Sequence, residues 1–298
     1  MNKVNSRVLL GATVGGLAAL TATVAIAMPP FGEWSTPANI ETLPGSSTEV
    51  NSASIDGCAS ISPDGLKLAF NSFRSSNQQI WIASRSSTSE GFGDPVLLPS
   101  QINTPAQESC PTITQGHRLY FTRSTGAPGT GDLYVSKLGP NGWSNPTNLG
   151  PGINTSDNVE EGVSFYEGEE GREVLVFSRR PNGAFVGPGG RIYESVDGAP
   201  ATLVAGGPYS SGSDNRPSVT HDGKTIFWDS LRTGSQSSDI WYATRSSTSE
   251  PFGQAIQLNQ VNSALAETRP FVSWDGDMLT VSANSDIWFA TREKGGGN

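Results

Sequence analysis

Residues 108–136 read ESCPTITQGHRLYFTRSTGAPGTGDLYVS, and versions of this stretch recur along nearly the whole chain. The clearest marker is a polar or charged residue followed by an aliphatic and an aromatic residue. It occurs five times, at intervals of 47 to 59 residues, as Gln79-Ile80-Trp81, Asp132-Leu133-Tyr134, Arg191-Ile192-Tyr193, Asp239-Ile240-Trp241 and Asp286-Ile287-Trp288. Self-similarity at such a period indicates a repeat architecture.

A second apolar run precedes each copy of this marker, and a turn signal precedes that run. The runs are Leu68-Ala69-Phe70, Leu119-Tyr120-Phe121, Leu175-Val176-Phe177, Ile226-Phe227-Trp228 and Leu279-Thr280-Val281. Asp64-Gly65, Asp222-Gly223 and Asp275-Gly276 favour hairpins in which both central residues have positive φ. Short strands and tight turns in units of about 45–55 residues predict one four-stranded blade per unit.

Five units predict an all-β fold, a five-bladed β-propeller of four-stranded antiparallel blades. Residues 31–40 match the last strand of other units, such as residues 92–97 and 252–258, whereas the final unit, 268–292, ends after its third strand. Because the N-terminal strand supplies what the last blade lacks, we expect it to close the ring and remove an exposed edge.

The stretch from Ser62 to Arg74 reads SPDGLKLAFNSFR. It resembles the WD40-like repeat of the TolB-type propellers, in which Ser-Pro-Asp-Gly is followed by an apolar run, Phe-x-Ser-x-Arg and Asp-Ile-Tyr. The fourth unit repeats it at residues 221–241. The resemblance covers about residues 31–292 and implies the propeller fold, although TolB itself has six blades. Because this fold hosts many unrelated activities, the resemblance implies no particular reaction.

The net charge of the chain argues against two classes of partner, nucleic acids and anionic lipids. The 298 residues carry a formal net charge of −9, whereas nucleic-acid phosphates require a basic surface. The same charge argues against docking on anionic lipid.

The first 27 residues differ from the rest. Lys3 and Arg7 precede an apolar run that ends Ala25-Ile26-Ala27, which predicts a secretory signal peptide at residues 1–27. The alternative is an uncleaved anchor, because the run is close to membrane-spanning length. We expect a propeller at 28–292 and a disordered polar tail at 293–298. The mature protein is then secreted, or located in the periplasm or cell envelope, and does not contact the membrane after cleavage of the signal.

The two cysteines, Cys58 and Cys110, occupy the same repeat position in the first and second units. In an exported chain this pattern predicts a disulfide. The alternative is a pair of buried thiols that act as small apolar residues.

Each unit carries an acid in the loop that enters its innermost strand, and such loops lie at one mouth of the axial channel of a propeller. The acids are Asp56, Glu108, Glu160, Asp214 and Glu267, and two residues further on stand Arg216 and Arg269 in units four and five. One hypothesis is an acidic funnel, a ligand-binding ring that takes a cation, a sugar or a cationic segment of a partner. The other is structural, each acid bonding within its own loop or to an arginine, because buried charges are normally paired.

A second set of charges lies near the same loops. Arg74, Arg123, Arg179 and Arg232 end second strands, while Asp132, Asp239 and Asp286 begin third strands. We expect these two groups to form ion pairs within each blade. The histidines, His117 and His221, fall in turns at the opposite end of the strands, which excludes a His-based triad or a His-rich metal site at the funnel.

These features leave three functional hypotheses. The first is a non-enzymatic binding module for a protein or carbohydrate. The second is a carbohydrate-active enzyme, since carboxylates about 5–10 Å apart suit glycoside hydrolysis. The third is hydrolysis assisted by a hard cation on the acids. We expect a monomer with no resident metal and no cofactor.

Overall fold

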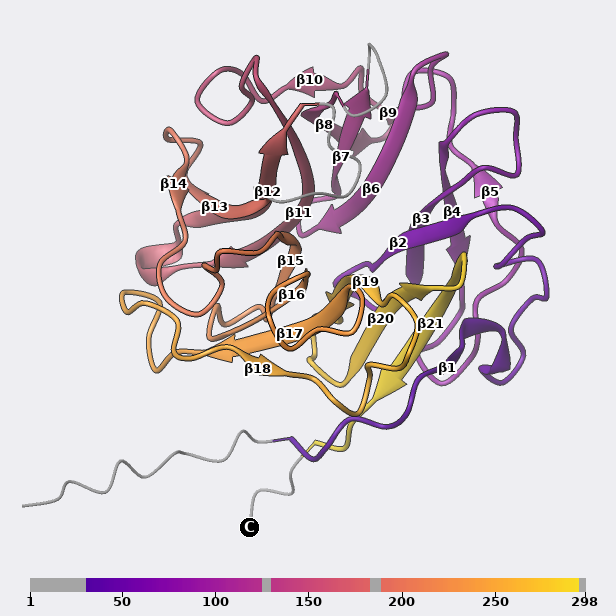
Figure 1. The fold of residues 1–298 in the computed structure, drawn as a ribbon. Helices are drawn as coiled ribbons and strands as arrows, with labels where there is room; N and C mark the ends of the chain where they lie inside the picture. Colours follow the sequence, from indigo (N-terminus) through magenta and orange to yellow (C-terminus); the bar gives the residue numbers. More distant parts are fainter. Residues whose placement is uncertain (1–30, 125–129, 183–188, 295–298) are drawn as a thin grey trace, which may run out of the picture.

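The structure, a computed structural model, describes residues 31–124, 130–182 and 189–294. Its strands form five antiparallel sheets arranged as blades around a central axis (Figure 1). The predicted five-bladed β-propeller is therefore confirmed. The predicted signal peptide lies outside the described residues. Within them, no helix is long and apolar enough to cross a membrane.

The strands of each blade follow one another from the axis outward. Blade one contains β2 (Asp56–Ile61), β3 (Lys67–Ser72), β4 (Gln79–Ser84) and β5 (Val96–Leu97). Blade two contains β6 (Gln107–Thr114), β7 (Arg118–Ser124), β8 (Asp132–Gly139) and β10 (Thr147–Asn148), with β9 (Gly142–Trp143) also paired to β8. Blade three contains β11 (Asn158–Glu167), β12 (Glu173–Pro181), β13 (Arg191–Val196) and β14 (Thr202–Leu203). Blade four contains β15 (Asp214–Val219), β16 (Thr225–Ser230), β17 (Asp239–Thr244) and β18 (Ile256–Gln257). Blade five contains β19 (Thr268–Val272), β20 (Met278–Ala283), β21 (Asp286–Thr291) and β1 (Ala38–Asn39). Two short 3-10 turns are η1 (Ile40–Thr42) and η2 (Glu169–Gly171).

The N-terminal strand closes the ring as predicted. β1 pairs antiparallel with β21, with Ala38 opposite Phe289, and so becomes the outer strand of the last blade (Figure 1). Upstream, Phe31 forms a β-bridge with Lys294, and Gly32 N donates to Glu293 O at 2.8 Å. Residues 293 and 294, expected to belong to the disordered tail, thus lie against the N-terminal segment, and 295–298 lie outside the described residues.

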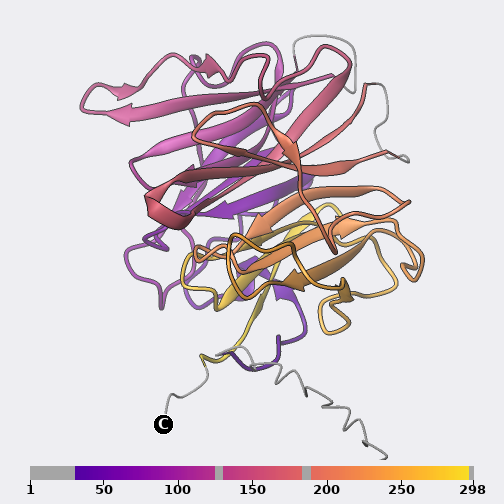
Figure 2. The same ribbon diagram turned by 90° about the vertical axis from the view of Figure 1, so that its left-hand side faces the viewer.

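Each blade buries both of its faces against its neighbours. The inner strands contact one another in sequence, and β19 contacts β2 to complete the circle, so that the blades pack face to face (Figures 1 and 2). Phe70 of β3 packs with Ile287 of blade five, whereas Ala69, next to it in the chain, packs with Leu119 of blade two. Successive side chains of a strand point to opposite faces, so one strand serves both interfaces.

The inner hairpins differ from the expectation in one respect. Gly65, Gly223 and Gly276 have positive φ, but none of the preceding aspartates does. In blade one the turn begins at Ser62, so its central residues are Pro63 and Asp64, and the proline ring fixes a negative φ at the first of them. The turn closes through Gly65 N donating to Ser62 O at 2.8 Å, and glycine alone takes the left-handed position.

Every inner strand contains a β-bulge near its start, which shapes the axis. The pairing register shifts at equivalent places in all five blades. Within each shift one residue has positive φ, and these residues are Cys58, Cys110, Gly162, Arg216 and Arg269. A bulge bends its strand and changes the direction of a side chain. The bulges thus place one side chain, or a glycine, from each blade at the axis.

Candidate functional site

The five acids of the predicted funnel lie inside their blades. Glu160 is fully buried and accepts from Thr155 Oγ1 at 2.7 Å and from Arg179 Nε at 2.9 Å. Arg179 also donates to Ile153 O at 2.7 Å, and its guanidinium carbon lies 4.3 Å from the centre of the Tyr193 ring. The acid, the loop and the second strand are therefore joined in one unit.

This arrangement repeats in blades one, two and four. The ion pairs are Asp56–Arg74 at 2.8 Å, Glu108–Arg123 at 2.9 Å and Asp214–Arg232 at 2.7 Å. Blade five differs, because Glu267 accepts from Ser263 N and Ser263 Oγ without an arginine partner. Burial raises the pKa of both Glu108 and Glu160, against the opposing effects of their threonine and arginine partners.

For the five acids this geometry favours the structural hypothesis over the acidic funnel, because each acid is turned into its own blade and bonded locally. The expectation for the arginines is corrected. The arginines pair with these inner-strand acids and not with the aspartates that begin third strands. Asp132 instead accepts from Asn148 at 2.8 Å, and Asp239 accepts from Gln257 at 2.6 Å.

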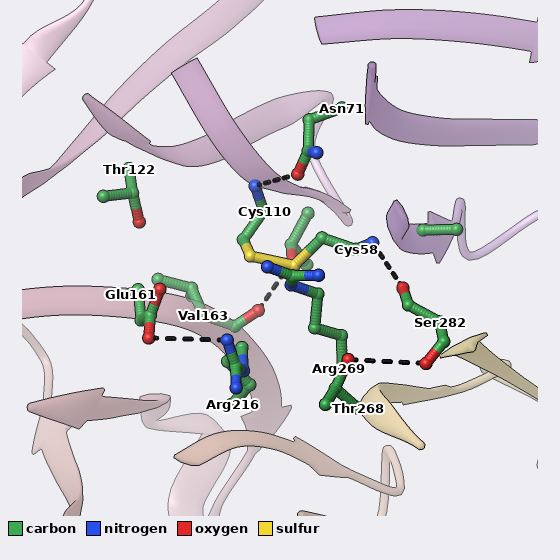
Figure 3. Close-up of a disulfide and its surroundings, with 12 residues drawn as sticks. Cys58, Asn71, Cys110, Thr122, Glu161, Val163, Arg216, Thr268, Arg269 and Ser282 are labelled. Atoms are coloured by element: carbon green, nitrogen blue, oxygen red, sulfur yellow. Dashed lines mark hydrogen bonds and ion pairs between the residues drawn. A yellow bond between two sulfur atoms is a disulfide. The ribbon is translucent and has the colours of Figure 1, made fainter. Parts of the chain in front are cut away.

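The axis is lined by the bulge residues two positions after each acid. Cys58 and Cys110 form a disulfide there with Cα atoms 4.8 Å apart, which links blades one and two (Figure 3). Their backbone N–H groups donate to side chains of neighbouring second strands, Cys58 to Ser282 Oγ at 2.9 Å and Cys110 to Asn71 Oδ1 at 3.1 Å. The disulfide is thus fixed between three blades.

On the opposite side of the axis, blades three, four and five form a cluster of charges. We call Glu161, Arg180, Arg216, Asp229 and Arg269 the axial cluster. Arg216 makes a two-point contact with Asp229, both distances being 2.9 Å, and approaches Glu161 at 3.8 Å. Arg180 Nε bonds Glu161 Oε1 at 3.0 Å.

The pKa values of this cluster follow from its charges. Burial alone would raise the pKa of Glu161, but the charges of Arg216 and Arg180 outweigh it and hold that pKa below its usual value. Burial would lower the pKa of Arg216, yet Asp229 and Glu161 raise it. The Glu161 carboxylate is therefore ionised at neutral pH. The carboxylates of Glu161 and Asp229 both already form ion pairs with arginines.

Arg269 stands apart from these pairs. Its backbone N–H donates to Asp229 Oδ1 at 3.0 Å, but its guanidinium forms no hydrogen bond or ion pair with the described part of the chain, and Nε is buried without a partner. Burial and the like charge of Arg216 lower the pKa of Arg269 to about 10. The group still carries its charge at neutral pH, and Figure 3 shows the side chain extending toward the disulfide.

A cavity of about 530 Å³, which we call the axial cavity, lies over the axial cluster. Its wall includes Gln78, Gln107 and Ser109, and Cys110, Glu161, Arg180, Arg216 and Arg269 lie at its base. None of the five predicted acids lines it. Of the predicted ligand-binding residues it contains the two arginines, Arg216 and Arg269.

Three members of the axial cluster were missed in the sequence. Glu161, Arg180 and Asp229 stand where other blades have small or neutral residues; the counterparts of Glu161, for example, are Gly57, Ser109, Asn215 and Thr268. This departure from the repeat is the feature of the sequence from which these three residues could have been identified. Among the described residues, no group of three or more acids, histidines or cysteines could hold a metal ion.

Comparison with known proteins supports the fold. No protein-family model matches the sequence, and no curated protein is similar to it. A TolB protein from Agrobacterium tumefaciens is 17% identical with a TM-score of 0.51, covering 83% of this chain and 80% of that one. An endo-arabinase from Bacteroides thetaiotaomicron is 16% identical with a TM-score of 0.53, covering 88% and 97%. The catalytic domain of an α-L-arabinofuranosidase from Coprinopsis cinerea is 11% identical with a TM-score of 0.55, covering 89% and 98%. At these identities the likeness shows the shared propeller fold alone.

Proposed function

We propose that this chain is an exported binding module that holds a small hydrophilic ligand in the axial cavity. The observation that carries the proposal is a set of polar side chains that the fold does not use. The side chains of Gln78, Gln107 and Ser109 line the cavity and make no hydrogen bond with the described residues. A concave site of this size with a few convergent polar groups is the usual form of a small-molecule site.

Export is part of this proposal and has two supports. The basic start and apolar run of residues 1–27 have the form of a secretory signal. The Cys58–Cys110 disulfide suits an oxidising compartment such as the periplasm or the extracellular space.

Binding is favoured over glycoside hydrolysis by the charges of the cavity. Hydrolysis of a glycoside requires two carboxyl groups beside the scissile bond, one of them with a raised pKa so that it can act as an acid. Among the described residues that line the cavity, Glu161 is the one carboxylate, and its pKa is lowered by two arginines. The site therefore lacks the paired acid and nucleophile in its described wall.

A glycan array combined with a library of small polar metabolites tests the proposal on the mature protein. The double variant Gln78→Ala with Gln107→Ala should lose affinity for the compounds that bind, with little change in its unfolding midpoint. Gln254→Ala, at an exposed position of blade four, is the matched control and should bind normally. Equal binding by both variants would contradict the proposal, and release of reducing sugar from a glycan would favour the hydrolase instead.

A further inference from the structure

The axial cluster contains one positive charge more than it can neutralise. Arg180, Arg216 and Arg269 contribute three guanidinium groups, whereas Glu161 and Asp229 contribute two carboxylates. Asp229 uses both oxygens on Arg216, and Glu161 is shared between Arg180 and Arg216. The guanidinium left over is that of Arg269.

The position of Arg269 directs this excess charge into the axial cavity. Its side chain starts at a bulge with φ of 56°, a conformation that few non-glycine residues adopt. It then extends beside the disulfide at the base of the cavity (Figure 3). Nε itself is buried, but the two terminal nitrogens, which also form no hydrogen bond with the described residues, are not fully buried and are the groups that a ligand can reach. A guanidinium without a partner in so buried a place is costly and rare enough in proteins that a missing partner is the first explanation to test.

We propose that the axial cavity binds a sugar acid, a polyhydroxylated carboxylate whose carboxylate group pairs with Arg269. This inference rests on the proposed binding function and specifies the ligand class for the same cavity. The hydroxyl groups of the ligand bond to Gln78, Gln107 and Ser109, whose amides and hydroxyl offer both donors and acceptors.

A carboxylate fits the base of the axial cavity better than a phosphate dianion does. The planar guanidinium presents parallel N–H groups that match the two oxygens of a carboxylate. The excess of one charge is neutralised by a single carboxylate, whereas a dianion would leave a negative charge facing Glu161, which also lines the cavity. The polar wall, in turn, favours hydroxylated ligands over simple fatty acids.

The experiment is calorimetric titration of the full mature protein with D-galacturonate, D-galactose, acetate and inorganic phosphate. Galacturonate should bind at least about tenfold more tightly than galactose or acetate, because only it offers both a carboxylate and hydroxyl groups. Trigalacturonate, as a further probe, distinguishes a free sugar acid from a uronate within a glycan. Tighter binding of either one supports the proposal.

Variants locate the effect at Arg269. Arg269→Gln should reduce galacturonate affinity about tenfold or more, to the level of galactose, while the affinity for galactose stays unchanged. Its unfolding midpoint should be equal to or above that of the wild type, because an unpaired buried charge is removed. Arg269→Lys keeps the charge without the planar fork and should show an intermediate loss. Arg118→Gln, at a partly exposed arginine paired with Glu173, is the control and should bind like the wild type.

Several outcomes would overturn the inference. If galactose and galacturonate bind equally and the Gln78 and Gln107 substitutions abolish both, the binding module stands and the sugar-acid assignment fails. Phosphate binding that depends on Arg269 and exceeds galacturonate binding would also refute it. If none of these probes binds the wild-type protein, the assignment is again refuted, while the wider screen of glycans and polar metabolites still decides the binding function.

Discussion

Glu160 and Glu161 are neighbours on β11, yet they belong to two different parts of the molecule. Glu160 points into blade three, where Arg179 and Thr155 satisfy it, and the same acid–arginine pair occurs in blades one, two and four. Glu161 lies at the base of the axial cavity between Arg180 and Arg216, and no other blade has an acid there. The acid that recurs from blade to blade has a structural role, whereas the acid that occurs in one blade alone lies at the candidate site.

The same contrast separates the two sides of the axis. At one repeat position, blades one and two carry the cysteines of the disulfide, whereas blades four and five carry Arg216 and Arg269. One pair is a covalent link between two blades. The other pair places charge where a ligand could use it. Substitutions on each side can test this division between stability and binding.

The largest effect is expected from the double variant Glu108→Gln with Glu160→Gln. Each substitution leaves a mostly buried arginine without its partner, which lowers the free energy of unfolding by roughly 3–5 kcal/mol per site, as measured by urea denaturation. Ligand binding in the axial cavity should persist in whichever single variant remains folded. Glu49→Gln, at an exposed position, is the control. Lost binding with unchanged stability would show instead that these acids face the ligand.

Next in size is the disulfide. Replacing Cys58 and Cys110 with serine opens a link between residues 52 positions apart, and the chain-entropy relation gives a loss of about 4 kcal/mol. Wild-type protein unfolded with and without reductant provides the internal comparison. If neither the serine substitutions nor the reductant changes the unfolding midpoint, the disulfide does not stabilise the fold.

A smaller effect is expected at the one acid that lacks an arginine. Glu267→Gln should cost about 1–3 kcal/mol, because its hydrogen bonds to Ser263 are weakened while no cation is left unpaired. The single variant Glu160→Gln, measured in the same denaturant series, should be the more destabilised of the two. The reverse order would mean that the arginine partners contribute little.

The smallest effect concerns pH and has opposite signs for the two neighbouring glutamates. The pKa of Glu161 is lowered by folding, so its contribution to stability exists above its unfolded pKa of about 4.3 and is lost as pH falls through the folded value. The pKa of Glu160 is raised, so its contribution exists below the unfolded pKa and is lost as pH rises through the folded value.

Denaturation curves at several pH values check these signs. The stability of the wild type relative to Glu161→Gln should rise with pH in the acidic range below about 4.3. The stability of the wild type relative to Glu160→Gln should fall with pH above that value. If the two stability differences change with pH in the same direction, the predicted contrast between Glu160 in the blade interior and Glu161 at the axis is wrong.

The blade pattern and its closure could be predicted because both are local properties of the chain. The repeated apolar runs, the glycine turns and the match between residues 31–40 and other outer strands are all visible in the sequence. Arg216 and Arg269 could also be singled out, since they share a repeat position with the two cysteines. The direction in which the five acidic side chains point could not be predicted, because a side chain at the start of an inner strand can face either the channel or the blade.

The sequence by itself determined the number of blades, the segment that closes the ring and the repeat position shared by the cysteines and arginines, since each depends on periodicity along one chain. Only the tertiary structure decided that Glu161, Arg180 and Asp229 meet Arg216 and Arg269, because they come from three different blades. Their convergence depends on the bulges and on ring closure, which bring distant segments to one axis. The unpaired guanidinium of Arg269 is a property of that convergence, and no residue pattern along the chain reports it.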